Sequence, residues 1–299
     1  MAVQRIPADE LCDARFLASL EHLRVVAKRV APRGRFAEQR SRDKGSGIEF
    51  KDYRPYSAGD DLRGIDWNVY RRLGRVFLRL FEELEDLPLY VLPDISRSAY
   101  LETPPRARAG LRCALAMAAV SLGQHDRVGV FPFAADLSVL LRPTGGKGRV
   151  LELARRLGEI EPGGETDFEL SLATFRGLRL REGLVCVVSD FFDPRGIEAV
   201  SSALGKLQHR LLLVRLVRQS DARPELAGDV RLVDCESGDV SDVSITSEVL
   251  ARYRAAYAQF VEHLANFARS RGAGLLDLDV ERDVIAQLER LFASGAYTA

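Results

Sequence analysis

A cluster of oxygen-bearing side chains follows an apolar run near residue 94, in the segment Asp94-Ile95-Ser96-Arg97-Ser98. The D-x-S-x-S spacing puts one carboxylate and two hydroxyl groups on alternate positions. At a strand-to-helix turn, all three can therefore face a single point. Carboxylate and hydroxyl oxygens are the ligands that hard cations prefer. The segment predicts part of a cation site.

Two later segments add further oxygen atoms. Ser189-Asp190 ends the apolar run 183–191, and Thr166 lies in the glycine-containing segment 163–167 that opens a helical pattern. The 4 histidines are scattered along the chain and lack metal-site spacing, which disfavours a soft or borderline metal. Mg²⁺ keeps several waters and needs few protein ligands, so three such loops predict a Mg²⁺ site that Mn²⁺ can also fill.

Structural explanations compete with metal binding at these positions. Asp and Ser also favour turns and helix N-caps, and Asp190 is placed to cap the helix that follows Pro194. Asp167 and Asp193 are expected to be solvated or to lie just outside the set of ligands. Residue type alone leaves both interpretations of Asp190 open.

The elements that must position these loops begin at Leu87, where apolar runs of strand length alternate with amphipathic helical patterns. We predict strands at 89–94, 127–133, 137–141, 183–191, 210–217 and 274–278. We predict helices at 107–122, 147–160, 168–178, 197–207, 247–271 and 283–292, and a hairpin from 230–234 and 243–245. This alternation predicts an α/β fold, with a mostly parallel sheet covered by helices on both faces. Ligands of such sheets bind beyond the carboxyl ends of the strands.

The region before residue 86 differs in composition. Residues 7–30 repeat apolar side chains at helical spacing, 31–47 form a polar and basic arm, and 75–81 alternate like a strand. We therefore divide the chain into an N-terminal helix with a charged and aromatic docking segment (1–85) and an α/β domain (86–299). We expect the docking segment to clamp the N-terminal region onto the domain, with a recognition surface as the alternative. Its charged and aromatic side chains are Arg54, Tyr56, Asp60, Asp61, Arg63, Asp66 and Trp67.

The overall composition narrows the class of partner. Lys plus Arg and Asp plus Glu both number 43, so the chain lacks the basic excess of a general nucleic-acid binder. The basic stretch 24–44 is accordingly expected to be a solvated arm. Apolar runs stay below the ~18 residues of a membrane span, and the first residues lack the apolar core of a secretory signal. The 4 cysteines lie far apart, which predicts a reducing, cytoplasmic location.

The order of the motifs carries a family resemblance. D-x-S-x-S, then a Thr, then an Asp, on alternating strands and helices, resembles the metal-ion-dependent adhesion site of von Willebrand factor A (vWA) domains. The resemblance implies a sixth coordination position, left open for an acidic side chain of a partner protein. It also implies that one Mg²⁺ is bound by Asp94, Ser96, Ser98, Thr166 and Asp190.

The upstream block GSGIEFKDYRPYSAGDDLRGIDW carries a second, more specific resemblance. It is similar to the signature of the bacterial domain-of-unknown-function 58 family, whose members join such a block to a vWA-like domain. The likeness extends over residues 40–292. Members often accompany MoxR-type AAA+ ATPases, so the resemblance implies an adaptor in chaperone-like assembly with such an ATPase as its partner. Many members also have membrane helices near the N-terminus, and this sequence resembles the short, soluble branch.

Enzymatic interpretations fit the sequence less well. A phosphohydrolase of the haloacid dehalogenase type also places an Asp after its first strand and binds Mg²⁺. It needs a second Asp two residues further on as general acid, and Ser96 occupies that position. P-loop, nucleophile-elbow and H-E-x-x-H motifs are absent. We therefore expect a non-catalytic interaction protein. The alternatives are a scaffold with a non-functional metal site and, less favoured, a Mg²⁺-dependent phosphohydrolase.

Overall fold

The computed structural model describes residues 5–30, 48–57, 60, 65–83 and 87–293. Two compact units divide the chain: residues 1–31 together with 87–297, and residues 32–86. The N-terminal helices thus belong to the α/β unit, whereas the prediction grouped them with the residues up to 85. The reason is burial, because Leu11, Phe16 and Leu23 lie in the apolar core of the α/β unit.

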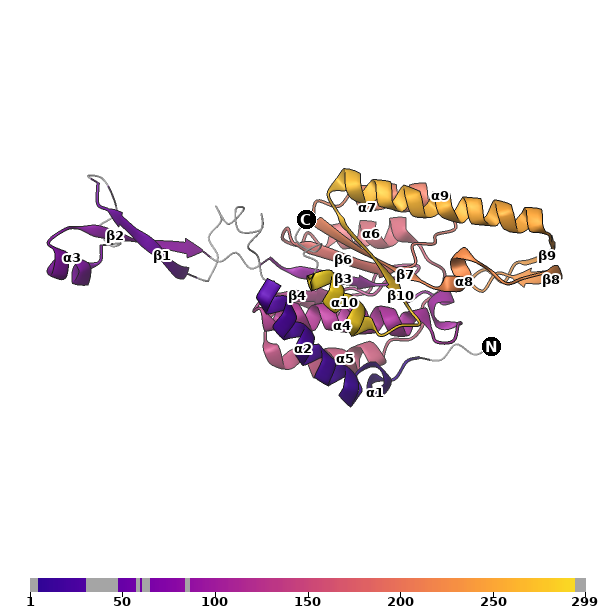
Figure 1. Cartoon of the computed structure of the whole chain (residues 1–299), viewed down its shortest axis with the longest axis horizontal. Helices are drawn as coiled ribbons and strands as arrows, with labels where there is room; N and C mark the ends of the chain where they lie inside the picture. Colours follow the sequence, from indigo (N-terminus) through magenta and orange to yellow (C-terminus); the bar gives the residue numbers. More distant parts are fainter. Residues whose placement is uncertain (1–4, 31–47, 58–59, 61–64, 84–86, 294–299) are drawn as a thin grey trace. The chain divides into compact units, whose positions relative to one another are not determined.

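A six-stranded sheet forms the centre of the larger unit, in the order β10-β7-β6-β3-β4-β5 (Figure 1). Every neighbouring pair is parallel except β4 and β5, which are antiparallel. The predicted α/β class with a mostly parallel sheet is therefore confirmed. The strands are β3 (Leu89–Pro93), β4 (Val128–Val130), β5 (Leu141–Thr144), β6 (Leu184–Ser189), β7 (Arg210–Val217) and β10 (Gly274–Asp279).

Helices cover both faces of this sheet (Figure 1). The core on one face is built with α1 (Ala8–Leu11), α2 (Ala14–Val30), α4 (Arg106–Gly123), α5 (Val150–Gly158) and α10 (Val284–Ala293). The core on the other face is built with α6 (Phe168–Gly177), α7 (Ile197–Gly205) and α9 (Ser247–Arg271). The short helical turns are η3 (Ser98–Tyr100), η4 (Lys147–Arg149) and α8 (Gln219–Ala222).

The two cores follow from the alternation of side chains along each strand. In β6, Val185 and Val187 belong to the core with α6 and α7, whereas Cys186 and Val188 belong to the core with α4. All four side chains are fully buried. A strand covered on both faces must be apolar at every position, which is why β6 appears in the sequence as an unbroken apolar run.

One predicted strand is wrong. The sequence predicts a strand over 137–141, whereas β5 begins at Leu141 and ends at Thr144. Leu137 is buried and forms an isolated bridge with Phe133. The apolar character of this segment therefore reflects burial of Leu137 in a core, and strand pairing with β4 begins four residues later.

An antiparallel hairpin stands outside the sheet. It consists of β8 (Gly228–Val233) and β9 (Val240–Ile245). The predicted hairpin is confirmed, with Val230 opposite Val243. Figure 1 shows the hairpin at the N-terminal end of α9, where the Thr246 hydroxyl accepts the Val249 N–H at 3.2 Å. Most hairpin residues are exposed, so this element has little core of its own.

The smaller unit is a hairpin whose strands are separated by a short helix. Its elements are β1 (Ile48–Pro55), α3 (Trp67–Leu73) and β2 (Phe77–Glu83), with β1 antiparallel to β2. The Asp66 carboxylate begins α3 by accepting the Asn68 N–H at 2.9 Å, and it also accepts the Tyr53 hydroxyl at 2.9 Å. Asp66 therefore fastens the start of the helix to β1.

The docking segment differs from its prediction at Trp67. An aromatic clamp requires the ring to pack, but the Trp67 ring is 59% exposed and lies edge-on to Tyr70 within α3. Arg54 and Asp60 form an ion pair at 2.7 Å. Asp61, Arg63 and the arm 31–47 lie outside the described residues, so the clamp and the solvated arm stay predictions.

Candidate metal centre

Three loops are joined by backbone hydrogen bonds beyond the carboxyl ends of β3 and β6. The Asp94 N–H donates to the Val188 carbonyl at 2.8 Å, and the Gly163 N–H donates to the Ile95 carbonyl at 2.6 Å. A Cβ atom at Gly163 would lie 2.4 Å from the Ala134 side chain, so only glycine allows this approach. The loops after β3 and β6 and the loop before α6 therefore form one edge, as the fold class requires.

Asp94 lies at the base of this edge and is 3% exposed. Its Oδ1 accepts the Ser96 N–H at 2.8 Å, and its Oδ2 accepts the Ser189 hydroxyl at 2.5 Å. Burial raises the pKa of Asp94, although these hydrogen bonds act in the opposite direction. Among the described residues, no Lys or Arg forms an ion pair with Asp94. A buried carboxylate without a cationic neighbour is costly, and a bound cation would remove that cost.

The two serines of the D-x-S-x-S segment face each other. The hydroxyl oxygens of Ser96 and Ser98 are 3.0 Å apart, and Ser96 is buried while Ser98 is half-buried. Adjacent ligands of an octahedral Mg²⁺ are about 3.0 Å apart when each bond is about 2.1 Å long. The spacing of the two hydroxyl oxygens therefore fits adjacent ligand positions on one ion.

Thr166 is buried, at 6% exposure, and contacts a residue from the hairpin. Its N–H donates to Glu236 Oε2 at 3.1 Å, and its hydroxyl donates to Glu236 Oε1 at 3.5 Å. The negative charge of Glu236 also contributes to raising the pKa of Asp94. Glu236 is thus a contact of Thr166 whose charge also acts on Asp94.

Asp190 completes the predicted set, and its surroundings differ from those of a helix cap. Its Oδ1 accepts the Phe192 N–H at 3.1 Å, whereas α7 starts after Gly196 with no side-chain cap. The capping alternative is therefore wrong. Burial and the negative charge of Asp94 raise the pKa of Asp190 to about 7, while the nearby Arg106 lowers it.

Asp94 and Asp190 are two carboxylates that follow neighbouring strands, and the charge of Asp94 raises the pKa of Asp190. Together with three hydroxyl groups, they offer only hard oxygen ligands, which suits Mg²⁺. Within the described ranges, no group of three or more His, Cys, Asp or Glu side chains is placed to hold a metal. A cation at this edge would therefore depend on the hydroxyl groups of Ser96, Ser98 and Thr166.

Arg106 is a neighbour of the site that sequence analysis missed. Its guanidinium binds both carboxylate oxygens of Asp221, at 2.5 and 2.8 Å, and Glu102 at 2.8 Å. The side chain is 8% exposed, and its Nε lies 3.9 Å from Asp190 Oδ2. Arg106 forms its shorter ion pairs with Asp221 and Glu102, so it compensates the charge of Asp190 only in part.

Two other missed residues differ in how much the sequence revealed. Ser189, which donates to Asp94, is a polar residue at the end of an otherwise apolar strand, and this signal was available. Glu236 is one acidic residue among many in an exposed hairpin, and the sequence carries no sign of its contact with Thr166. Arg106 is likewise indistinguishable in sequence from the other arginines of α4.

Asp167 and Asp193 both form hydrogen bonds and ion pairs within the protein, with side chains that are 35% and 0% exposed. Asp167 caps α6 by accepting the Leu170 N–H at 2.7 Å, and Asp193 accepts the Phe168 N–H at 3.0 Å. Arg195 forms ion pairs with both carboxylates, at 2.6 and 3.1 Å. This cluster ties the loop that carries Thr166 to the loop that follows Asp190.

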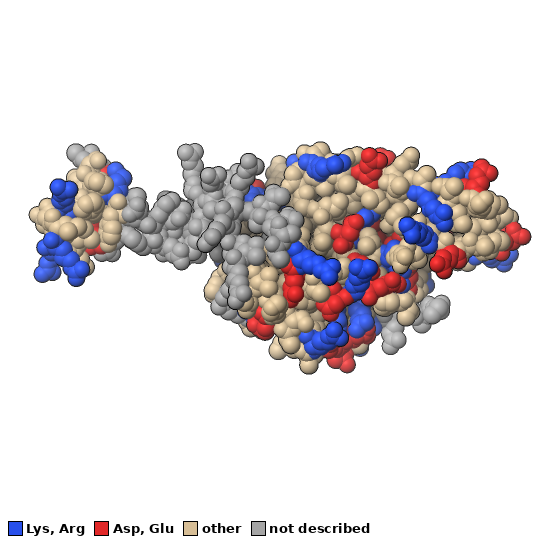
Figure 2. All heavy atoms as spheres, in the orientation of Figure 1, with Lys and Arg blue, Asp and Glu red and all other residues tan. Residues whose placement is uncertain are grey.

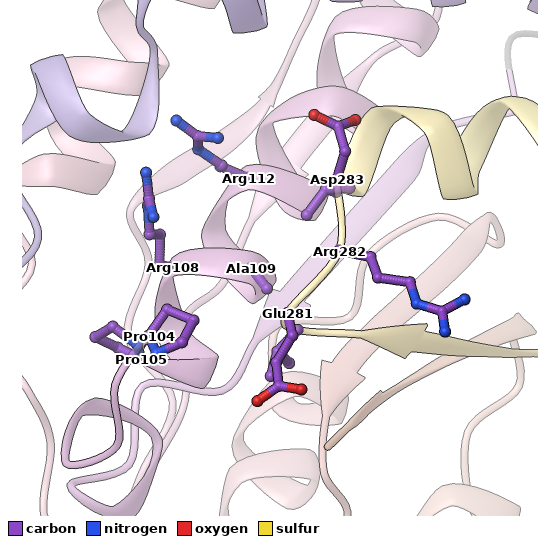
Figure 3. Close-up of a pocket in the computed structure, with 10 residues that line it drawn as sticks. Pro104, Pro105, Arg108, Ala109, Arg112, Glu281, Arg282 and Asp283 are labelled. Carbon is purple, nitrogen blue, oxygen red and sulfur yellow. The ribbon is translucent and has the colours of Figure 1, made fainter. Parts of the chain in front are cut away.

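A separate pocket of about 120 Å³ lies between the start of α4 and the turn from β10 to α10 (Figure 3). None of the predicted ligands lines it. Two of its lining residues, Arg108 and Arg112, form ion pairs with Glu10 at 3.0 Å and with Asp13 at 2.5 Å. The pocket is therefore a seam at which the N-terminal helices are attached to α4.

The fold and the site together define a class of protein. A six-stranded sheet with one antiparallel edge strand, and oxygen-bearing loops at the carboxyl edge, make this a vWA-like domain. The family model described as "Protein of unknown function DUF58" matches residues 52–263, and the chain belongs to that family. The chain is 28% identical over 261 residues to the uncharacterized protein Rv1480 of Mycobacterium tuberculosis, covering 84% of this chain and 80% of that protein.

Solved structures with similarity to this chain include two from Bacteroides. One is an aerotolerance-related membrane protein from Bacteroides fragilis, with 14% identity and a TM-score of 0.41. The other is the conserved hypothetical protein BatB from Bacteroides thetaiotaomicron, with 16% identity and a TM-score of 0.40. Each comparison covers 71% of this chain and 100% of the other.

The surface and the helices add two observations. Figure 2 shows Lys and Arg interspersed with Asp and Glu on the visible face of the larger unit, in keeping with the balanced composition. Among the described residues, no helix is both long enough and apolar enough to cross a membrane.

Proposed function

We propose that this protein is a non-catalytic, Mg²⁺-dependent protein-interaction module. In this proposal the ion is held by the carboxylates and hydroxyls of the candidate metal centre, and it accepts a carboxylate from an Asp or Glu of a partner protein. The supporting observation is the pair of neighbouring carboxylates, Asp94 buried and Asp190 half-buried, in which the charge of Asp94 raises the pKa of Asp190. One divalent cation between them would neutralise both charges.

The same residues argue against catalysis. Asp94 is fully engaged by the Ser96 N–H and the Ser189 hydroxyl, so it is held in place rather than free to attack a substrate. A phosphohydrolase would carry its general acid two residues after Asp94. The residue there is Ser96, whose hydroxyl does not give up a proton near neutral pH. Adhesion through a metal ion needs neither group to react.

The partner in this proposal is a MoxR-type AAA+ ATPase, with the protein acting as an adaptor in the cytoplasm. This step rests on the family to which the chain belongs. It is tested by measuring binding of the purified ATPase in Mg²⁺ and again in chelator. Binding that survives removal of Mg²⁺ would contradict a metal-bridged contact.

The metal step is tested by calorimetric titration of Mn²⁺ and Mg²⁺ into the wild type and Asp190→Asn. The substitution keeps the shape of the side chain but removes its charge, so we expect affinity to fall at least about tenfold because a charged ligand is lost. Glu165→Gln is the matched control, because it removes an exposed charge of the same sign from the loop that carries Thr166. We expect the control to bind like the wild type, with circular dichroism confirming that all three proteins fold.

Equal affinity in the wild type and Asp190→Asn would remove Asp190 from the site. A folded wild type that binds neither ion would favour the alternative of a scaffold with a non-functional metal site.

A further inference from the structure

The helix α3 of the smaller unit leaves its large apolar side chains in solvent. Trp67, Tyr70 and Leu73 are 59%, 43% and 64% exposed, and their spacing of three residues places them along one side of the helix. A single exposed apolar side chain is ordinary, but three neighbours that include the only tryptophan of the chain form a patch. Exposed apolar patches of this kind indicate contact with another molecule.

The same helix carries positive charge. Arg71, Arg72 and Arg75 are exposed, and within the described part of the chain none of them forms an ion pair. Residues 67–81 contain these three and Arg79 but no Asp or Glu. Figure 2 shows Lys and Arg side chains on the smaller unit, with little acidic surface on the face in view. The apolar patch therefore lies in a basic surrounding.

The smaller unit does not neutralise this charge with the acidic side chains that the structure describes there, which are Asp60 and Asp66. Asp60 forms an ion pair with Arg54 at 2.7 Å. Asp66 is 5% exposed, and its Oδ1 accepts the N–H groups of Asn68 and Val69 at 2.9 and 3.2 Å. Both carboxylates are thus engaged elsewhere, and the arginines of α3 are open to carboxylates from outside.

α3 is fixed at both ends, so the patch is ordered before any partner binds. At its start, the Asp66 N–H donates to the Phe77 carbonyl at 3.0 Å. At its end, Gly74 has a φ of 66° and donates its N–H to the Tyr70 carbonyl at 2.8 Å. The Trp67 and Tyr70 rings contact each other edge-on, with their centroids 6.1 Å apart. A preorganised aromatic surface loses little conformational entropy on binding.

The combination of side chains favours a protein partner. Trp, Tyr and Arg are the residue types that carry most of the binding energy at protein interfaces, and guanidinium groups pair with carboxylates through two hydrogen bonds. A nucleic acid is bound through phosphates along an extended basic surface, whereas here the charge is concentrated on one short helix of a chain with balanced composition. Helices that bind membrane surfaces insert a broader apolar face than three side chains provide.

We propose that α3 is the docking surface for an acidic segment of a partner protein. Arg71, Arg72 and Arg75 pair with its Asp and Glu side chains, while Trp67 and its apolar neighbours on α3 receive apolar side chains of the same segment. This contact goes beyond the proposed function, because it lies on the smaller unit and requires no cation.

The test uses the emission of Trp67, which as the only tryptophan reports on this surface alone. The probe is a synthetic helical peptide with Glu on one face and Leu on the other, titrated into the full chain in the presence of chelator. We expect saturable binding with a blue shift of the emission, and binding at least about tenfold weaker in Arg71→Gln/Arg72→Gln. The matched control Arg252→Gln/Arg254→Gln removes two exposed arginines from α9 and should bind like the wild type.

A second variant separates the apolar contribution from the charge. Leu73→Ser keeps all the arginines but removes one exposed apolar side chain, so we expect binding about fivefold weaker. Circular dichroism checks that each variant folds. Equal binding by the wild type, Leu73→Ser and Arg71→Gln/Arg72→Gln would overturn the proposal, as would a wild type that does not bind the peptide.

Three further outcomes would also overturn it. Single-stranded oligothymidine or vesicles of phosphatidylglycerol, titrated at the same ionic strength, could bind more tightly than the peptide, which would assign α3 to a nucleic acid or to a membrane. Trp67 could also resist quenching by acrylamide in the free protein, which would show that the chain itself covers the patch. Because the titrations are made in chelator, their failure would leave the metal centre standing, and failure of Mn²⁺ binding would leave the α3 surface standing.

Discussion

The six-stranded sheet and the β8–β9 hairpin both contribute to the candidate metal centre, but their surroundings are opposite. β6 is buried from Val185 to Ser189 and ends beside Asp190, whereas most of the hairpin that carries Glu236 is exposed. The sheet thus fixes its contribution by packing in two cores. The hairpin fixes its contribution by hydrogen bonds in a turn.

This difference indicates where stability and movement reside. Segments with few buried apolar contacts open locally at low free energy, whereas core strands open only with global unfolding. Asp94 and Asp190 are therefore expected to keep their positions when the exposed hairpin opens locally. The predictions below compare substitutions in the packed unit around the sheet with substitutions in the exposed hairpin.

The largest difference is expected from truncating an apolar side chain in each region. Phe175 is buried, and its ring contacts those of Tyr90 and Phe131. Phe175→Ala should lower the free energy of unfolding by about 3–5 kcal/mol through lost burial and a cavity. Leu232→Ala, in the exposed hairpin, should change it by less than about 0.5 kcal/mol. Urea denaturation of both variants measures this, and similar losses would show that the hairpin is part of the cooperative core.

A smaller difference is expected between two arginines that form ion pairs. Arg106 and Asp221 are 8% and 9% exposed, whereas Arg231 and Asp242 in the hairpin are 70% and 72% exposed. Arg106→Met leaves a buried carboxylate unpaired and should cost about 3 kcal/mol of the free energy of unfolding. Arg231→Met removes an exposed pair worth less than about 1 kcal/mol. Thermal unfolding compares them, and an Arg106→Met protein as stable as the wild type would contradict the role assigned to this network.

The smallest effect is on the pH dependence of the free energy of unfolding, and it concerns a histidine of the larger unit. Burial lowers the pKa of His209, whose ring contacts those of Tyr90 and Phe175. The unfolded chain therefore binds more protons there as the pH falls below the ordinary value of about 6.5. The stability that His209 contributes is present above that pH and is lost as the pH falls through it. In His209→Phe, unfolding measured between about pH 5 and 7 should depend less steeply on pH, and an unchanged slope would refute this.

Local sequence pattern was sufficient for much of the fold. The predicted strand 210–217 and helix 247–271 have the observed bounds, because an unbroken apolar run and a long capped helical repeat each identify one element. The helix α3 was missed because it has only seven residues and none of them is buried, so it leaves no apolar repeat in the sequence. Leu137 was misassigned because burial and strand pairing produce the same apolar signal.

The candidate site was predictable where its residues follow strands. Asp94, Ser96 and Asp190 were predicted to lie together because the carboxyl ends of neighbouring parallel strands must meet at one edge, and the structure places their loops at that edge. Glu236 was not found, because its contact with Thr166 spans 70 residues and depends on how an exposed hairpin is placed. Arg106 depends equally on the position of Asp221, which no local pattern encodes.

The packing of α2 against α10 has a consequence for how the chain is made. α2 ends at Val30 and α10 begins at Val284, so a ribosome adding ~5–20 residues per second needs roughly 10 to 50 s to produce the partner of α2. During that interval, the apolar side chains of α2 can pack against α4 but not against α10. The part of the core that α2 shares with α10 is therefore completed only after α10 has been synthesised, and a nascent chain stalled before Val284 is expected to require a chaperone.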